Sequence, residues 1–292
     1  MTYNPNTYNG TRYTEILSEL LHANDTIGKN FVRVIDGIKH KISIPSISGD
    51  ITLQPYAEVM PQGVSVNDTI SLKDAVLQPD KFTAYTTFTM NALRETYFSE
   101  SMGKGAAQMD SDPFLNAVLA QAQGKIGEAV EKKIWTGLNT VMTGSTAQKI
   151  VRPALSAANL KAEFTELYAK IDKNVIRSKE AVIFADLDVY QLVQLANVNE
   201  QFRDTFTVDS EGNARFLNTV INFVPMPDGS EGTLMAGRRS DFIVGTDMTD
   251  DFKGIEVGKV YNNSDLLFLK AVMTLAVGVA APAQKVLRTV AP

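Results

Sequence analysis

The stretch "DPFLNAVLAQAQGKIGEAVEKKIWTGL", residues 112–138, contains the strongest structural signal in the chain. Asp112 can cap a helix, and Pro113 suits its first turn. Apolar side chains then recur at steps of three and four residues, which predicts an amphipathic helix over residues 113–138. At about 1.5 Å per residue, this helix would be roughly 39 Å long. The sequence therefore predicts one dominant helix near the middle of the chain.

Two glycines, Gly124 and Gly127, lie inside this helix. Glycine in a helix interior costs about 1 kcal/mol relative to alanine, so we expect another backbone to pass close by or the helix to bend there. The residues expected to pack the helix against the rest of the protein are Leu119, Gly124, Ile126, Gly127, Val130 and Ile134.

The chain before this helix is poor in helical patterns. A polar arm leads into a short predicted helix over residues 13–24. "GIKHKISI" (37–44) alternates apolar and polar residues, which predicts a half-buried strand with Ile38 and His40 on its apolar face. From Pro45 to Pro79 there are four prolines and no helical stripe, which indicates a long, extended β loop.

The chain after the helix alternates between helical and strand patterns and ends in a β-rich tail, so the fold class is α+β. "AVIFA" (181–185) predicts a buried strand, after which Asp186 can cap the next helix. The expected segments are an N-terminal arm and short helix (1–35), the extended β loop (36–80), a region containing the long helix (81–155), a mixed α/β region (156–252) and a β-rich return (253–292).

The amino-acid composition excludes several classes of function. The chain has 292 residues, of which 44% are hydrophobic and 21% charged, as in an ordinary globular protein. It contains no cysteine, which excludes disulfides and thiolate chemistry. The N-terminus has no apolar core typical of a signal peptide, and the apolar run 271–282 is too short to span a membrane. The net charge of -5 is unlike that of a protein that grips DNA, and the one basic cluster, Lys170 to Lys179, is interpreted as solvated.

Four aspartates in "SDFIVGTDMTDDF" (240–252) are the best candidates for a metal site: Asp241, Asp247, Asp250 and Asp251. The spacing does not fit a calcium-binding EF-hand loop, because position 249 is threonine and position 252 is phenylalanine. Turn residues and surface charges explain the stretch more simply. His22 and His40 have no neighbouring ligands at metal-binding spacing. No catalytic, cofactor or metal residues are therefore predicted, and the protein is not expected to be an enzyme.

The order of these segments resembles the major capsid proteins of tailed bacteriophages, whose fold is shared with encapsulin shells and the herpesvirus capsid floor. The resemblance covers essentially the whole chain. "DGIKHKISIPSISGDITLQPYAEVMPQGVSVNDTISL" (36–72) resembles the extended loop, and residues 113–138 the spine helix of the peripheral domain. "EAVIFADLDVYQLVQLAN" (180–197) resembles the axial α/β domain, which would comprise residues 156–252, and "LFLKAVMTLAVGVAAPAQKVL" (267–287) the strand that returns to the peripheral domain.

The resemblance implies a structural protein of the virion. It would assemble with copies of itself into pentamers and hexamers of an icosahedral head in the host cytoplasm, and enclose double-stranded DNA without reading its sequence. A portal and decoration proteins would be further partners, and no membrane is expected. Because only some thirty residues precede the extended loop, we also expect a separate scaffolding protein.

The extended loop holds apolar residues but is too thin to form a core, so they are predicted to contact neighbouring subunits: Ile51, Leu53, Tyr56, Val59 and Met60. Two other functions remain open at this point. One is an encapsulin-like compartment that encloses a protein cargo. The other is a metal-dependent hydrolase that uses the acidic cluster between Asp241 and Asp251.

Overall fold

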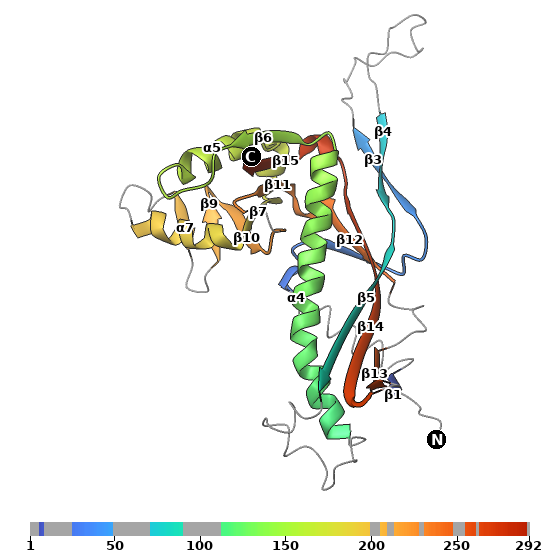
Figure 1. Cartoon of the computed structure of the whole chain (residues 1–292). Helices are drawn as coiled ribbons and strands as arrows, with labels where there is room; N and C mark the ends of the chain where they lie inside the picture. Colours follow the sequence, from blue (N-terminus) through green and yellow to red (C-terminus); the bar gives the residue numbers. More distant parts are fainter. Residues whose placement is uncertain are drawn as a thin grey trace, which may run out of the picture.

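The computed structural model describes residues 6–8, 25–48, 71–89, 112–198, 205–208, 213–227, 231–247, 255–260 and 263–290. Helices and strands mix along this chain, so the predicted α+β class is confirmed. The largest elements of the described part are one long helix, a six-stranded sheet, a seven-stranded sheet and a projecting two-stranded hairpin (Figure 1). The short helix predicted over residues 13–24 lies outside the described residues.

The predicted long helix is α4 (Asp112–Gly144), which begins at the expected aspartate and continues six residues beyond the expected end. Its 33 residues correspond to a length of about 50 Å. The extension follows the same apolar stripe, because Leu138 and Met142 are both fully buried. The helix stops at a glycine, after which the amide of Ser145 donates to the carbonyl oxygen of Met142 at 3.3 Å.

The six-stranded sheet lies beside α4 (Figure 1). Its longest strand is β14 (Asn263–Val279), which pairs antiparallel with β5 (Asp80–Thr89) and, through its last residues, with β12 (Phe242–Thr246). Alternate residues of β14 belong to the core that contains the apolar face of α4, as the period of two in a strand requires. The other strands of this sheet are β1 (Asn6–Tyr8), β2 (Arg33–Asp36) and β13 (Ile255–Val260).

The helix approaches this sheet closely at Gly137, where a methyl group would overlap the side chain of Val277 on β14. The glycines singled out in the sequence behave differently. Gly127 is buried. Gly124 is exposed, and in the described part of the chain nothing lies within 4 Å of where its β-carbon would be. The expected close contact is therefore wrong for Gly124, because the helix reaches the sheet only farther along.

A hydrogen-bonded relay fixes the N-terminal segment to the long helix. The short helix α2 (Asp25–Gly28) contributes the fully buried hydroxyl of Thr26. The indole nitrogen of Trp135 donates to this hydroxyl at 2.8 Å, and the hydroxyl donates to the carboxylate of Glu131 at 2.8 Å. The relay satisfies the polar end of a tryptophan that is otherwise enclosed in the core.

The seven-stranded sheet has the strand order β6–β15–β11–β7–β10–β9–β8. Its central strand, β7 (Ala181–Asp186), is buried at all six positions, as predicted for "AVIFA". Its other strands are β6 (Gln148–Arg152), β8 (Phe206–Val208), β9 (Ala214–Phe216), β10 (Thr219–Val224), β11 (Leu234–Arg238) and β15 (Val286–Val290). The helices of this region are α5 (Leu160–Lys170), α6 (Lys173–Arg177) and α7 (Leu187–Val198), with η3 (Arg239–Asp241) and η4 (Pro282–Gln284) as short 3-10 turns.

The described residues form two large apolar cores and a small third one, and aromatic rings in the first large core come from both sheets. The ring centroid of Phe184, on β7, lies 4.7 Å from that of Trp135 and 4.9 Å from that of Phe242, on β12. Helices α5 and α7 form the second core with the other face of the seven-stranded sheet, around Phe164 and Ile183. None of the helices in the described part of the chain is long and apolar enough to span a membrane.

The projecting hairpin consists of β3 (Ile42–Ser48) and β4 (Ser71–Leu77), paired antiparallel along their whole length (Figure 1). Its base is anchored by Leu77, which is fully buried with Ile38 in a small core. The strand predicted over 37–44 is wrong in its first half, because Gly37 adopts a left-handed conformation with φ of +75° and redirects the chain.

His40 is consequently exposed rather than on an apolar face.

Candidate functional site

The aspartate cluster does not converge on one point in the described part of the chain. Asp241 forms an ion pair with the fully buried Lys285 at 2.5 Å. Asp247 is buried at the other end of β12. Asp247 follows Asp241 by six positions across an extended strand, which places the two about 20 Å apart at about 3.3 Å per residue, too far for a shared metal ion. Asp250 and Asp251 lie outside the described residues.

The interpretation of these acids as surface charges is also incomplete. Asp241 neutralises a lysine that has no exposed surface, and Asp247 has only 8% of its surface exposed. Both therefore have structural roles. Among the described residues, no group of three or more histidines and acids could hold a metal ion. His40 is exposed, and His22 lies outside the described residues.

Among the carboxyls in the described part of the chain, Asp186, the predicted helix cap, is the one whose pKa is clearly raised, and burial is the main cause. Its Oδ1 accepts hydrogen bonds from the amides of Leu187 at 2.8 Å and Met226 at 3.4 Å, and its Oδ2 accepts one from the amide of Gly232 at 3.3 Å. The carboxyl thus joins the start of α7 to the segments around β10 and β11. Its oxygens are occupied by backbone donors, which is the arrangement of a structural residue.

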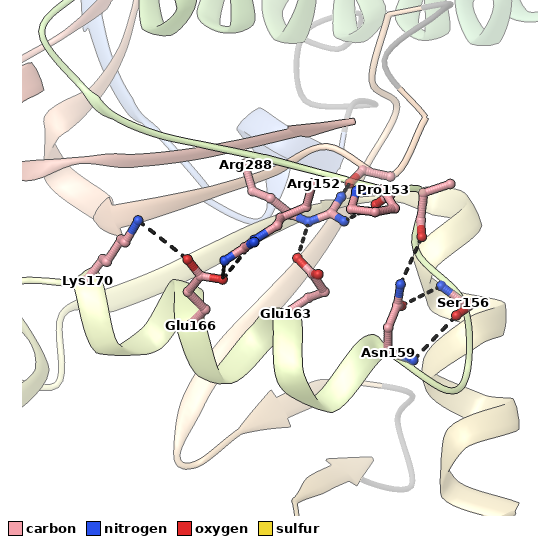
Figure 2. A network of polar contacts seen from close by, with 10 residues as sticks. Arg152, Pro153, Ser156, Asn159, Glu163, Glu166, Lys170 and Arg288 are labelled. Carbon is pink, nitrogen blue, oxygen red and sulfur yellow. Dashed lines mark hydrogen bonds and ion pairs between the residues drawn. The ribbon is translucent and has the colours of Figure 1, made fainter. Parts of the chain in front are cut away.

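Another buried charge, that of Arg288, lies against α5 (Figure 2). The guanidinium of Arg288 donates to Glu163 at 2.9 Å, to the carbonyl oxygen of Gly232 at 2.9 Å and to that of Pro153 at 2.5 Å. Its side chain has no exposed surface. These contacts hold β15, α5 and the segment after β6 together, so this network stabilises the seven-stranded region.

The exposed counterpart of this network lies farther along α5 (Figure 2). Arg152 donates to Glu166 at 2.7 Å, and Lys170 lies 3.6 Å from the same carboxylate. The hydrogen bond from Arg152 is the largest cause of the lowered pKa of Glu166. These side chains are partly open to solvent, so they contribute much less to stability than the buried pair.

The projecting hairpin exposes apolar side chains close to the body of the molecule. Val76 is 46% exposed and Ile42 is 38% exposed. The residues predicted to contact neighbouring subunits, Ile51, Leu53, Tyr56, Val59 and Met60, belong to residues 49–70, between β3 and β4, and lie outside the described residues. The described half of the loop is therefore a two-stranded ribbon with apolar groups open to solvent.

Further apolar groups are exposed elsewhere in the described chain. Tyr85 on β5 stacks on Phe268 of β14, with ring centroids 6.1 Å apart, and more than half of its surface is exposed. Leu187 and Leu195 are exposed on α7. Single exposed apolar residues are common on protein surfaces, so exposure at these positions does not by itself mark a contact.

The residues predicted to pack the long helix differ in how deeply they are buried. Ile126, Val130 and Ile134 are buried against the six-stranded sheet. The side chain of Leu119 lies outside the described part of the structure. Trp135, Leu138 and Met142, which were not predicted, are fully buried on the same helix. The stripe could have been followed to Met142 by the same spacing, whereas Gly137 and the partners of Arg288 have no local signal.

Of the comparisons with known proteins, only the comparison with solved structures gives matches. No protein-family model and no curated protein matches the sequence. Among solved structures, a chain of the satellite phage P4 procapsid that includes the size determination protein matches with a TM-score of 0.61 at 10% identity, over 99% of this chain and 94% of that one. The capsid of the cyanophage P-SCSP1u matches with a TM-score of 0.56 at 12% identity, over 100% and 90%.

The capsid of an empty GTA particle also matches, with a TM-score of 0.56 at 12% identity, over 100% of this chain and 95% of that one. The chain has the fold of tailed-phage major capsid proteins. The resemblance stated from the order of elements is thus confirmed for the fold. The matches extend over 99–100% of this chain.

Proposed function

We propose that this chain is the major capsid protein of a tailed phage and assembles with copies of itself into an icosahedral head. The observation that supports this best is the likeness to capsid and procapsid chains over 99–100% of this chain. A capsid function requires no catalytic centre, and the buried charges of the described residues are all occupied by structural contacts. The protein would then be located in the virion after assembly in the host cytoplasm.

The segments of the chain have corresponding roles in this proposal. Residues 81–155 and 253–292 form the peripheral domain around α4, and residues 156–252 form the axial domain. The presence of one core around α4 and β14 and another around α5, α7 and the seven-stranded sheet supports a division into two domains. The sheets cross the proposed limits, because β6 and β15 join the seven-stranded sheet from outside residues 156–252 and β12 joins the six-stranded sheet from inside them. Residues 1–35 are the N-terminal arm, and residues 36–80 are the extended loop.

The extended loop is proposed to hold neighbouring subunits together. An isolated two-stranded ribbon is marginally stable in water, so its apolar groups need a partner surface. Ile51, Leu53, Tyr56, Val59 and Met60 would lie on an adjacent copy in a pentamer or hexamer. A stable interface removes about 1,600 Å² of surface from water, and a loop of this length can supply a large part of that area.

The shell is proposed to enclose double-stranded DNA without sequence-specific contacts. The net charge of -5 suits a lining from which a genome is later released, since neutralising phosphates provides most of the affinity of DNA-gripping proteins. A separate scaffolding protein, a portal and decoration proteins complete the expected set of partners.

Electron microscopy of the purified protein tests this function. Negative staining should show closed particles, and nuclease-protected DNA should be recovered from virions. Replacement of residues 48–64 by a short Gly-Ser linker should leave a folded, soluble subunit, with unchanged circular dichroism, that forms no closed particles. Particles that enclose a specific protein and no DNA would identify an encapsulin-like compartment instead. Closed particles of normal size from the linker variant would contradict the role of the loop.

A further inference from the structure

We propose that a basic cleft between the two sheets binds an acidic peptide segment of a partner protein. The cleft has a volume of about 390 Å³, which is within the usual range of 300–1,000 Å³ for binding pockets. It lies where β2 and η3 meet the first residues of β7. This inference does not depend on the proposed function, because it rests on the charges and shape of the cleft alone.

Three cationic side chains line the cleft: Arg33, Lys179 and Arg239. All three are exposed, and none forms an ion pair with another residue in the described part of the chain. The one carboxylate on the rim, Glu180, already lies 2.9 Å from the guanidinium of Arg238. The cleft therefore has three uncompensated positive charges, although the chain as a whole has a net charge of -5.

The three cations belong to segments that are far apart in the sequence. Backbone contacts hold these segments next to one another. Arg33 starts β2, which pairs in parallel with β12 through Ile243. The amide of Arg239 donates to the carbonyl oxygen of Glu180 at 3.2 Å, which fixes η3 to the turn before β7. The cleft is thus built by the junction of two sheets and not by one flexible loop.

Lys179 has an unusual backbone conformation, with φ of +60°. Its amide donates to the carbonyl oxygen of Ile176 at 3.1 Å and closes the end of α6, a position where glycine is normally found. A side chain in this conformation destabilises the fold by about 1 kcal/mol. Strained residues of this kind concentrate at functional sites, and here the strained residue contributes a positive charge to the cleft.

The remaining lining favours a peptide over a nucleic acid. Val32, Ala181 and Val220 provide apolar wall, while the three cations offer partners for carboxylates. An acidic peptide can pair its carboxylates and also place an apolar side chain against this wall. A DNA duplex is too wide to enter a cleft of this volume and could present only part of its backbone at the rim.

Fluorescence anisotropy with a labelled hexaglutamate peptide tests the proposal on the full-length protein. The wild type should bind this peptide, with an affinity that falls as salt is added, and should not bind hexaglutamine. Arg33→Gln and Arg239→Gln should each weaken binding about tenfold, the loss expected for one charge-assisted hydrogen bond. Lys149→Gln is the matched control, because Lys149 is exposed on β6 and does not line the cleft, and it should leave binding unchanged.

Lys179→Gly separates a binding role from a structural one. This variant should weaken hexaglutamate binding about tenfold, while its thermal midpoint stays equal to or above that of the wild type, because glycine relieves the backbone strain. A lower midpoint together with weaker binding would show that Lys179 serves the fold, and would overturn its assignment to the site. Binding of a 20-nucleotide single-stranded DNA that depends on Arg33 and Arg239, without binding of hexaglutamate, would overturn the peptide class.

Discussion

The seven-stranded sheet region and the β3–β4 hairpin use their polar and apolar groups in opposite ways. In the sheet region the buried Arg288 and Asp186 find all their partners within the same subunit. In the hairpin, two strands share one ladder of hydrogen bonds, and Ile42 and Val76 remain partly exposed. The first region is complete as a single subunit. The second is expected to become complete through contacts with other copies.

The strongest test of the complete region is removal of its buried cation. Arg288→Met leaves the carboxylate of Glu163 and two carbonyl oxygens without their donor. Breaking a buried pair by removing one partner lowers stability by about 3–5 kcal/mol. Urea unfolding of the unassembled subunit should show this loss.

The double variant Arg288→Met/Glu163→Gln should recover part of this stability, because the unpaired charge is removed with its partner. If Arg288→Met alone unfolds at the same urea concentration as the wild type, the network is not a source of stability.

The next test concerns the contact between the long helix and the six-stranded sheet. Gly137→Ala places a methyl group against Val277, whose branched side chain is stiff, and overpacking of this kind costs about 1–3 kcal/mol. Gly124→Ala is the matched control on the same helix. It meets open space and should stabilise the helix by up to about 1 kcal/mol. Urea midpoints that move in opposite directions for these variants would confirm where the backbones approach.

The features predictable from sequence were those with a local period. The stripe that predicts α4 and the apolar run that predicts β7 can both be read within a few turns or residues. The hydrogen bond between Arg288 and Glu163 joins residues 125 positions apart, and the clash at Gly137 involves a strand 140 residues away. Such contacts depend on how the chain returns on itself, which single-residue patterns do not encode.

The candidate contact residues were predicted by a different argument. The extended loop is too long and too thin to form a core, which marks the segment as a contact region but does not define its geometry. The alternation of apolar and polar residues over 37–44 did not predict where the strand begins. Gly37 adopts a left-handed conformation, and the strand starts only at Ile42. The basic cleft was not predicted, because Arg33, Lys179 and Arg239 become neighbours only where the two sheets meet.

A smaller effect is expected at the exposed ion pair on α5. The lowered pKa of Glu166 means that the folded protein holds this proton less tightly than the unfolded chain does. The pair therefore stabilises the fold above the ordinary glutamate pKa of about 4.3, and this contribution is lost as the pH falls through the lower pKa of the folded state. Glu166→Gln should lower the thermal midpoint slightly at neutral pH, by less than Gly137→Ala does.

This difference from the wild type should disappear in acid. A difference that persists unchanged in acid, where the wild-type carboxylate is protonated, would show that Glu166 acts through packing and not through its charge.

The smallest effect on subunit stability, and the sharpest contrast between the two regions, is expected at exposed valines. Val76 on the hairpin and Val151 on β6 are 46% and 58% exposed. Serine at either position should change the unfolding free energy of the subunit by no more than about 0.5 kcal/mol. Burial of the exposed part of a valine in an interface is worth roughly 1 kcal/mol, or about a fivefold change in the concentration needed for association. Val76→Ser should therefore raise the protein concentration required to form particles, as measured by light scattering, while Val151→Ser should not. Equal assembly by both variants would mean that the hairpin is no more dependent on neighbours than the sheet, and that the contrast between the two regions is wrong.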